Sequence, residues 1–391
     1  MLTKTDDGGM PQKPHLSLET SEPIGFGRGW ISGVIAAVLG VAGLGAVLCL
    51  RFPDVLTIPH LREHYPVAVI RGVVHVALVA SFLLGTVSVC LRANKMLGVS
   101  AIGLTAVAAL LGGGGAAGGE ASGVWGLGLD WFVLNLILYS LIYIPLERVF
   151  AKHPEQPTFR KEWRVDLTYF FFNTLFIQVL SLMTMRPAMV FFDWARLPAI
   201  AQTVSGLPVL VQVPLCVLVA DLAQYWVHRA FHTIPVLWRF HAIHHSAKSM
   251  DWLAGARLHL VDVLVTRGLT YVPIYVLGFS ETAIGIYVVI VATQATFLHA
   301  NVRWEFPVIR RFVATPCFHH WHHAAEREAI DKNFSVHSPL WDWVFGTYYM
   351  PGWWPKRYGL CDRQEMPASW TLQLIQPFRR DRRSPAADPT S

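Results

Sequence analysis

The chain is organised around the sequence HRAFHTIPVLWRFHAIHH, residues 228–245. This stretch holds one HxxxH group and one HxxHH group, and a third group, HHWHH, follows at residues 319–323. Nine of the 17 histidines lie in these two windows. Because residues three and four apart share one face of an α-helix, each group can direct its imidazoles toward a common point. We therefore predict that the three groups build one metal centre.

The imidazoles in these groups are too numerous for one ion. A zinc site takes three or four protein ligands, whereas eight imidazoles suit two metals. Imidazole binds Fe, Zn, Cu and Ni, so the ligand type leaves the metal open. Two isolated histidines, His259 and His299, are expected as further ligands, and His320 is expected to support the others. The predicted metal ligands are His228, His232, His241, His244, His245, His259, His299, His319, His322 and His323.

Polar residues near the histidines are candidates for orienting them. A metal-bound histidine usually passes its other ring N–H to a carboxylate or a carbonyl. Asp221 lies seven residues before His228, on the same helix face and inside an apolar run, where an acid is usually functional. Asp331 and Asn333 follow the third group and either orient it or serve as surface caps and turns. We predict all three as supporting residues of the site.

The composition indicates a membrane protein. Hydrophobic residues make up 53% of the chain, charged residues only 15%, and the mean hydropathy is +0.40. A soluble domain has about 25% charged residues. The net charge of +6 fits Lys and Arg at membrane edges better than a nucleic-acid surface, so no nucleic acid is expected. The five cysteines form no close pair, which excludes a disulfide framework and a thiolate metal site.

Eight apolar runs approach the roughly 20 residues that a membrane-spanning helix needs. These runs are residues 30–50, 67–91, 96–118, 125–145, 167–190, 207–227, 260–279 and 282–298. The last two form a hairpin whose arms are short enough for a shallow or re-entrant placement as well as a full crossing. We predict an all-α polytopic membrane bundle with a cytosolic, histidine-rich helical cap that carries a di-metal site. The predicted regions are a polar tail at 1–28, an N-terminal transmembrane region at 29–124, a catalytic membrane domain at 125–350 and a cytosolic tail at 351–391.

Charge predicts which side of the membrane carries the histidines. Residues 147–166 contain five Lys or Arg, and short loops rich in these residues stay in the cytoplasm. A two-span hairpin after this loop returns the chain to the same side at His228. The hairpin at 260–298 then returns it there again before the third group. The histidine groups and both termini are therefore expected on the cytoplasmic side.

The three groups and their neighbours resemble the fatty acid hydroxylase/sterol desaturase superfamily of integral-membrane di-iron enzymes. The pattern HxxxH, HxxHH and a later HxxHH is shared, and the likeness covers residues 130–350. Some members carry an extra HxxxH before the last group; its second histidine matches His299, and Ala295 stands where the first would fall. The surrounding sequences that resemble the family are DLAQYWVHR at 221–229, LWRFH at 237–241, DKNF at 331–334 and WDWVFGTY at 341–348.

The resemblance implies O2-dependent oxidation of a lipid C–H bond by two iron ions, with O2 as co-substrate. The lipid would be a fatty acyl chain, a sterol-like molecule or an ether lipid, and hydroxylation is favoured over desaturation on the same metal core. Two external electrons are needed. The chain has no Rossmann motif and no ferredoxin-type cysteine motif. A separate donor is therefore expected, which would be a cytochrome b5-like protein, a ferredoxin or a reductase.

Two other classes of protein are less favoured. A metal transporter should place His and Asp along a path through the membrane, whereas these groups lie at the ends of apolar runs. A membrane zinc hydrolase requires three or four protein ligands and a nearby Glu that acts as a base, and the chain has no HExxH motif. Both remain alternatives to a lipid-oxidising enzyme.

Overall fold

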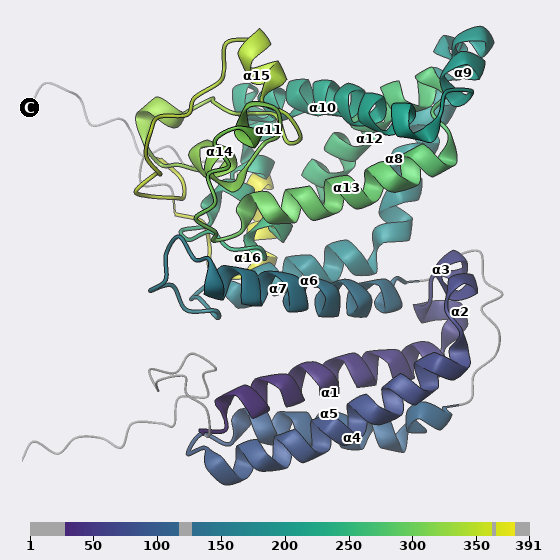
Figure 1. Ribbon diagram of the computed structural model, residues 1–391, viewed down its shortest axis with the longest axis vertical. Coiled ribbons are helices and arrows are strands. Elements are labelled where there is room, and N and C mark those ends of the chain that lie inside the picture. The colour runs from purple at the N-terminus through teal and green to yellow at the C-terminus, as the bar shows by residue number, and fades with distance from the viewer. Residues whose placement is uncertain (1–27, 117–126, 362–364, 380–391) are drawn as a thin grey trace, which may run out of the picture. The chain divides into compact units, whose positions relative to one another are not determined.

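The computed structural model describes residues 28–116, 127–361 and 365–379. Over these residues the chain is helical, with two isolated β-bridges and no strand (Figure 1). The prediction of an all-α fold is confirmed. The described residues form two compact units, one of residues 28–53 and 63–116 and one of residues 54–62 and 127–379. Most of the predicted N-terminal tail and the end of the C-terminal tail lie outside the described residues.

The first unit contains three long apolar helices that pack closely on one another. They are α1 (Trp30–Arg51), α4 (Val67–Leu91) and α5 (Met96–Leu110), followed by the short 3-10 helix η1 (Gly113–Gly115). Small residues allow the close approach, as is usual between membrane helices. A Cβ added at Gly98 would lie 2.5 Å from the Gly85 carbonyl oxygen. This unit carries none of the predicted ligands or supporting residues.

The second unit contains the long helices that lead to the histidines. These are α6 (Leu129–Val149), α7 (Trp163–Leu175), α8 (Ile177–Phe192), α10 (Val209–Thr233), α12 (Leu260–Leu277) and α13 (Glu281–His299). Their apolar core includes Cys216 and Ala220 of α10, Ile274 of α12 and Tyr287 of α13. The core therefore fixes α10, whose last turns carry the first histidine group, against α12 and α13.

Short elements complete the chain. The α-helices among them are α2 (Pro53–Leu56), α3 (Pro59–His64), α9 (Pro198–Ser205), α11 (Pro235–His241), α14 (Pro316–His322), α15 (Leu340–Val344) and α16 (Trp370–Ile375). The 3-10 helices are η2 (Asp193–Ala195), η3 (His244–Ser246), η4 (Ala254–Ala256), η5 (Ile309–Arg311), η6 (Arg327–Ala329) and η7 (Gln376–Phe378). Within the predicted C-terminal tail, the Trp370 ring stacks on Phe172 of α7 at 4.5 Å between centroids. That part of the tail is therefore packed against the second unit.

Seven helices in the described chain are long and apolar enough to cross a membrane. They are α1, α4, the stretch Met96–Gly115 that contains α5, then α6, α10, α12 and α13. The eighth predicted run, 167–190, is divided between α7 and α8, which are bent by 59° at Phe176 and are either one broken span or a re-entrant segment. The chain is thus a multi-pass membrane protein, and its described residues hold seven candidate spans, or eight if the bent pair is one.

The predicted hairpin break lies between α12 and α13. Gly278 ends α12 with φ 75°, a left-handed conformation that glycine adopts without strain. Ser280 then begins α13, because its side chain accepts a hydrogen bond from the Ala283 N–H. The hairpin brings His299, the last residue of α13, beside His244 and His319.

Candidate metal centre

Nine imidazoles gather at the ends of α10 and α13 in two neighbouring groups. Within each group the ligand-capable atoms all lie within 4.8 Å of one another. Group 1 consists of His228, His232, His241, His245 and His322. Group 2 consists of His244, His299, His319 and His323. The two groups adjoin, since the His245 and His323 rings stack at 4.4 Å between centroids.

Each HxxHH group is split between the two sites, which corrects the expectation that its imidazoles share one point. His241 and His245 lie in group 1, whereas His244 lies in group 2. The α-helix α11 ends at His241, and a 3-10 turn carries the next two. With three residues per turn, adjacent side chains point about 120° apart. The helical-face argument therefore fails for neighbouring histidines, while the prediction that all of them converge locally agrees with the structure.

The third histidine segment is divided in the same way. His322 belongs to group 1, and His319 and His323 belong to group 2. On an α-helix successive side chains are about 100° apart, so neighbours cannot face one point. The rings of His322 and His323 are nearly perpendicular, at 89°. One short helix, α14, thus supplies both groups and ties their positions together.

Backbone carbonyls orient four of the rings through Nδ1. These contacts join His228 to Phe334 (2.7 Å), His322 to Lys332 (2.8 Å), His244 to Arg257 (3.1 Å) and His299 to Ala295 (2.7 Å). A carbonyl only accepts, so each Nδ1 carries the proton and each Nε2 keeps its lone pair. This arrangement is typical of metal-binding histidines.

Two carboxylates contact group 1. Asp262 of α12 lies 2.6 Å from His241 Nδ1, and both side chains are buried. The Thr266 hydroxyl donates to the other Asp262 oxygen at 3.1 Å. Asp331, one of the predicted supporting residues, lies 3.5 Å from His232 Nδ1. Asp262 is not among the predicted supporting residues, although an acid inside a membrane helix is itself a signal of function.

Several buried ring nitrogens have no hydrogen-bond partner in the described part of the chain. In group 1 they are Nε2 of His232, His245 and His322. Other ring nitrogens meet only one another, as His228 and His241 do at 3.0 Å between Nε2 atoms. Buried polar atoms are nearly always paired, so unpaired nitrogens directed at a common point fit a cation. The donor set therefore fits two metal ions.

Burial also keeps the imidazoles in the form that binds metal. For five of them that lie outside the membrane-spanning helices, burial lowers the pKa well below its usual value near 6.5, and neighbouring imidazoles lower it further. These five are His244, His245, His319, His322 and His323. At neutral pH they are uncharged, and their lone pairs are available to a cation.

Two histidines near the centre lie outside both groups. His259, a predicted ligand, accepts a hydrogen bond at Nδ1 from the Val261 N–H (3.0 Å) and donates from Nε2 to the Leu374 carbonyl (3.1 Å). It caps the start of α12 and holds the C-terminal segment. His320 contacts the Tyr358 hydroxyl at 2.9 Å and the backbone carbonyl of His299. His320, which was expected to support the ligands, thus contacts the backbone of one group 2 histidine.

Asp221 and Asn333 stabilise the backbone near the site instead of contacting a ring of either group. The Asp221 carboxylate accepts the backbone N–H groups of residues 336–338 at 2.8–2.9 Å. Asn333 donates to the carbonyls of Phe318 (2.9 Å) and Tyr349 (2.7 Å), and its φ of 58° is one that Asn tolerates. Asp221 was expected to orient His228, but the carbonyl of Phe334 does so.

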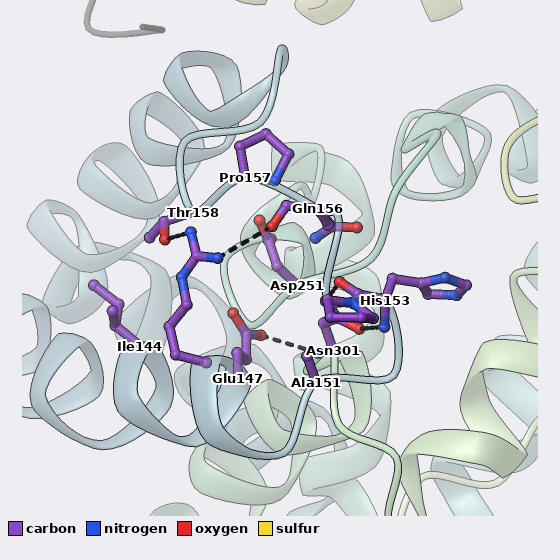
Figure 2. A pocket seen from close by; sticks show the side chains of 11 residues that line it. Ile144, Glu147, Ala151, His153, Gln156, Pro157, Thr158, Asp251 and Asn301 are labelled. Carbon is purple, nitrogen blue, oxygen red and sulfur yellow. Dashed lines mark hydrogen bonds between the residues drawn. The ribbon is translucent and has the colours of Figure 1, made fainter. Parts of the chain in front are cut away.

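A small polar cavity lies beside the segment that follows α6 (Figure 2). One Glu147 oxygen accepts the backbone N–H groups of Trp252 (2.7 Å) and Asn301 (3.0 Å). Asp251 lines the same cavity. Its volume of about 20 Å³ is room for one water and not for a lipid chain. The contacts fix the C-terminal ends of α6 and α13 to the loop after the second histidine group.

Comparison with known proteins identifies the region that carries the histidines. Residues 213–347 match the family model described as fatty acid hydroxylase. The matched range contains every residue of both histidine groups. No solved structure matches this chain.

Three curated relatives illustrate the range of similar proteins. The ornithine lipid hydroxylase of Rhizobium tropici is 29% identical over 44% of this chain and 52% of its own length. Human alkylglycerol monooxygenase is 26% identical over 33% of this chain and 28% of its own length. A very-long-chain aldehyde decarbonylase of Oryza sativa subsp. indica is 24% identical over 32% of this chain and 22% of its own length. The chain thus covers about half or less of each.

Proposed function

Since the chain matches the fatty acid hydroxylase family model and fits the fatty acid hydroxylase/sterol desaturase superfamily, we propose that it is a lipid hydroxylase. The reaction would use O2 to hydroxylate a lipid C–H bond at a di-iron centre. The observation that carries the proposal is the pair of adjoining imidazole groups. The relatives named for ornithine lipids and alkylglycerols support a lipid substrate. The proposed catalytic domain is the predicted one, residues 125–350.

The nine grouped histidines would hold the two irons, five in group 1 and four in group 2. Bound iron would supply the redox chemistry that reduces O2. In the overall reaction one lipid C–H bond, O2, two electrons and two protons give one C–OH group and water. The protein contributes fixed ring orientations, neutral imidazoles and burial that excludes bulk water. At His241, Asp262 holds the proton on Nδ1 so that Nε2 stays free.

We place this centre on the cytoplasmic side of the membrane. Contacts of Glu147 join the end of α6 to the residues after α13, so the basic segment 147–166 and the histidine groups share one end of the helices. Basic segments of this kind stay in the cytoplasm. A separate donor, a cytochrome b5-like protein, a ferredoxin or a reductase, would deliver electrons there. Exposed Arg311, Lys356 and Arg357 offer it a positive surface.

The proposal is tested by measuring the metal content and the lipid oxidation of the same protein preparation. Full-length protein, purified without oxygen, is expected to hold two irons per chain. With a reductant and isotopically labelled O2, it is expected to add one labelled oxygen atom to a lipid from a membrane extract. Loss of two hydrogens without oxygen gain would instead show desaturation. Zinc alone, with no O2-dependent product, would overturn the proposal in favour of a hydrolase or a transporter.

Two matched variants test whether lipid oxidation depends on the histidine groups. His322→Ala removes a ligand of group 1 and should abolish lipid oxidation. His320→Gln changes a histidine of the same helix that lies outside both groups, and should keep the iron. Equal loss in both variants would show that the effect comes from disturbing α14 and not from removing a ligand.

A further inference from the structure

A buried network of two arginines and two aspartates lies beside group 2. The exposed fractions of these side chains are 3% for Arg160, 0% for Asp166, 6% for Asp251 and 2% for Arg257. Charges buried this far are costly unless each is paired. Well-packed apolar residues in their place would often be as stable, so stability alone does not explain the network.

Hydrogen-bonded ion pairs join the four charges. Arg160 donates to both Asp251 oxygens, at 2.7 and 3.0 Å, and also to Asp166. Arg257 donates from Nε to the other Asp166 oxygen at 2.5 Å. Asp166 therefore links the two arginines, and it lies in the first turn of α7. The network ties the basic segment before α7 to the turn that follows the second histidine group.

Arg257 connects this network to His244. Its backbone carbonyl accepts the His244 Nδ1 proton at 3.1 Å, while its side chain is held by Asp166. The same guanidinium donates to the Ser246 hydroxyl at 3.1 Å, one residue after His245. A shift of the side chain would move the carbonyl with it, so the charge network fixes the orientation of the His244 ring.

The turn at residues 251–257 also contacts His299. Asp251 accepts the Ala254 N–H at 2.9 Å and closes the turn. A Cβ added at Gly255 would lie 2.9 Å from His299 Nδ1, so the backbone there contacts the ring. Two of the four group 2 histidines, His244 and His299, therefore contact this turn. The carbonyls and carboxylates that contact group 1 belong to residues outside it.

On the basis of the di-metal function proposed above, we propose that Arg160, Asp166, Asp251 and Arg257 form a positioning network that sets group 2 and determines how tightly its metal binds. The network acts through the backbone of residues 251–257 and touches neither metal position. Its loss should therefore weaken group 2 selectively and leave group 1 intact.

Cobalt(II) titration of metal-free, full-length protein in lipid nanodiscs tests this proposal. Cobalt binds imidazole and reports its geometry by visible absorption. Wild-type protein is expected to bind two ions. Arg257→Lys keeps the charge but loses the fork that contacts Asp166 and Ser246, and should bind the second ion about 10- to 100-fold more weakly. Arg164→Lys, an exposed change at the start of the same α7 helix, is the matched control and should bind as wild type.

The outcomes separate this proposal from the function itself. Wild-type protein that binds fewer than two ions contradicts the di-metal centre. Two ions of unchanged affinity in Arg257→Lys overturn the network alone. If Arg257→Lys does not unfold cooperatively, Ser246→Ala replaces it, since that change removes one hydrogen bond from the Arg257 guanidinium and leaves the ion pairs of Arg257 with Asp166 and Glu162. A weaker second site in Ser246→Ala then supports the proposal, and an unchanged one overturns it.

Discussion

The two histidine groups are supported in different ways. Group 1 has five imidazoles, and the carboxylates of Asp262 and Asp331 contact two of them. Group 2 has four imidazoles, and in the described chain its Nδ1 contacts are to the backbone carbonyls of Arg257 and Ala295. Backbone carbonyls also contact two of the group 1 rings. Group 1 thus combines nearby negative charge with carbonyl support, whereas the described Nδ1 contacts of group 2 are to carbonyls.

This difference has chemical consequences. A carboxylate on Nδ1 makes the imidazole a stronger donor as well as fixing its orientation. A carbonyl fixes orientation with less effect on basicity. Group 1 should therefore hold its metal more tightly and be sensitive to loss of charge. Group 2 should be sensitive to small displacements of the backbone that leave every charge in place.

The largest expected effect comes from replacing adjacent histidines that belong to different groups. His322→Ala should remove one metal from group 1, and His323→Ala should remove one from group 2. Lipid oxidation should fall by more than the 10- to 100-fold typical of supporting residues. Cobalt absorption of each variant would identify the group that survives. Loss of both metals in each variant would show that the groups bind as one cooperative unit.

A smaller effect is expected from Asp262→Asn. The amide oxygen can still accept the His241 Nδ1 proton, so the variant removes charge and keeps shape. Metal affinity at group 1 should fall by about 10- to 100-fold, with group 2 unchanged. Thr266→Val, which removes only the hydroxyl on the far side of the carboxylate, should have less effect. An equal loss at both groups would contradict the separate dependence on charge.

Gly255→Ala tests the dependence of group 2 on shape. The new Cβ would lie 2.9 Å from His299 Nδ1 and 3.2 Å from Cγ, so the ring must move. We expect about tenfold weaker binding at group 2, at the low end of the range for supporting changes. Gly285→Ala, in the helix α13 that ends at His299, meets nothing within 4 Å and is the control. If Gly255→Ala binds as wild type, His299 does not depend on this contact.

The spacing of the histidines predicted which imidazoles gather, but not how they divide. Spacing reports a shared helical face only while the helix continues, and α11 ends at His241. The Asp262 contact joins residues 21 apart, and the Arg257 contact uses a carbonyl that every residue has. Neither leaves a local pattern in the sequence. Carbonyl support in particular follows from the fold and not from residue type.

Hydropathy predicted most of the spans for a similar reason. It reports whether a run is apolar enough to leave water, which is a local property. The bend at Phe176 within the fifth run depends on tertiary contacts, such as the bond from Asn173 of α7 to the Ala256 carbonyl (3.1 Å). The order of the apolar runs was therefore predictable, whereas the break that divides the fifth run into α7 and α8 was not.

The smallest effect is expected at His259, which sequence spacing placed among the ligands. Because its ring nitrogens bond to Val261 and Leu374, His259→Asn should leave both metals bound. Asn keeps an acceptor for the helix start and loses the bond to Leu374. Thermal unfolding should therefore show a loss of about 1 kcal/mol, and His259→Ala should lose about 1 kcal/mol more. Metal content that falls in His259→Asn would return this residue to one of the groups.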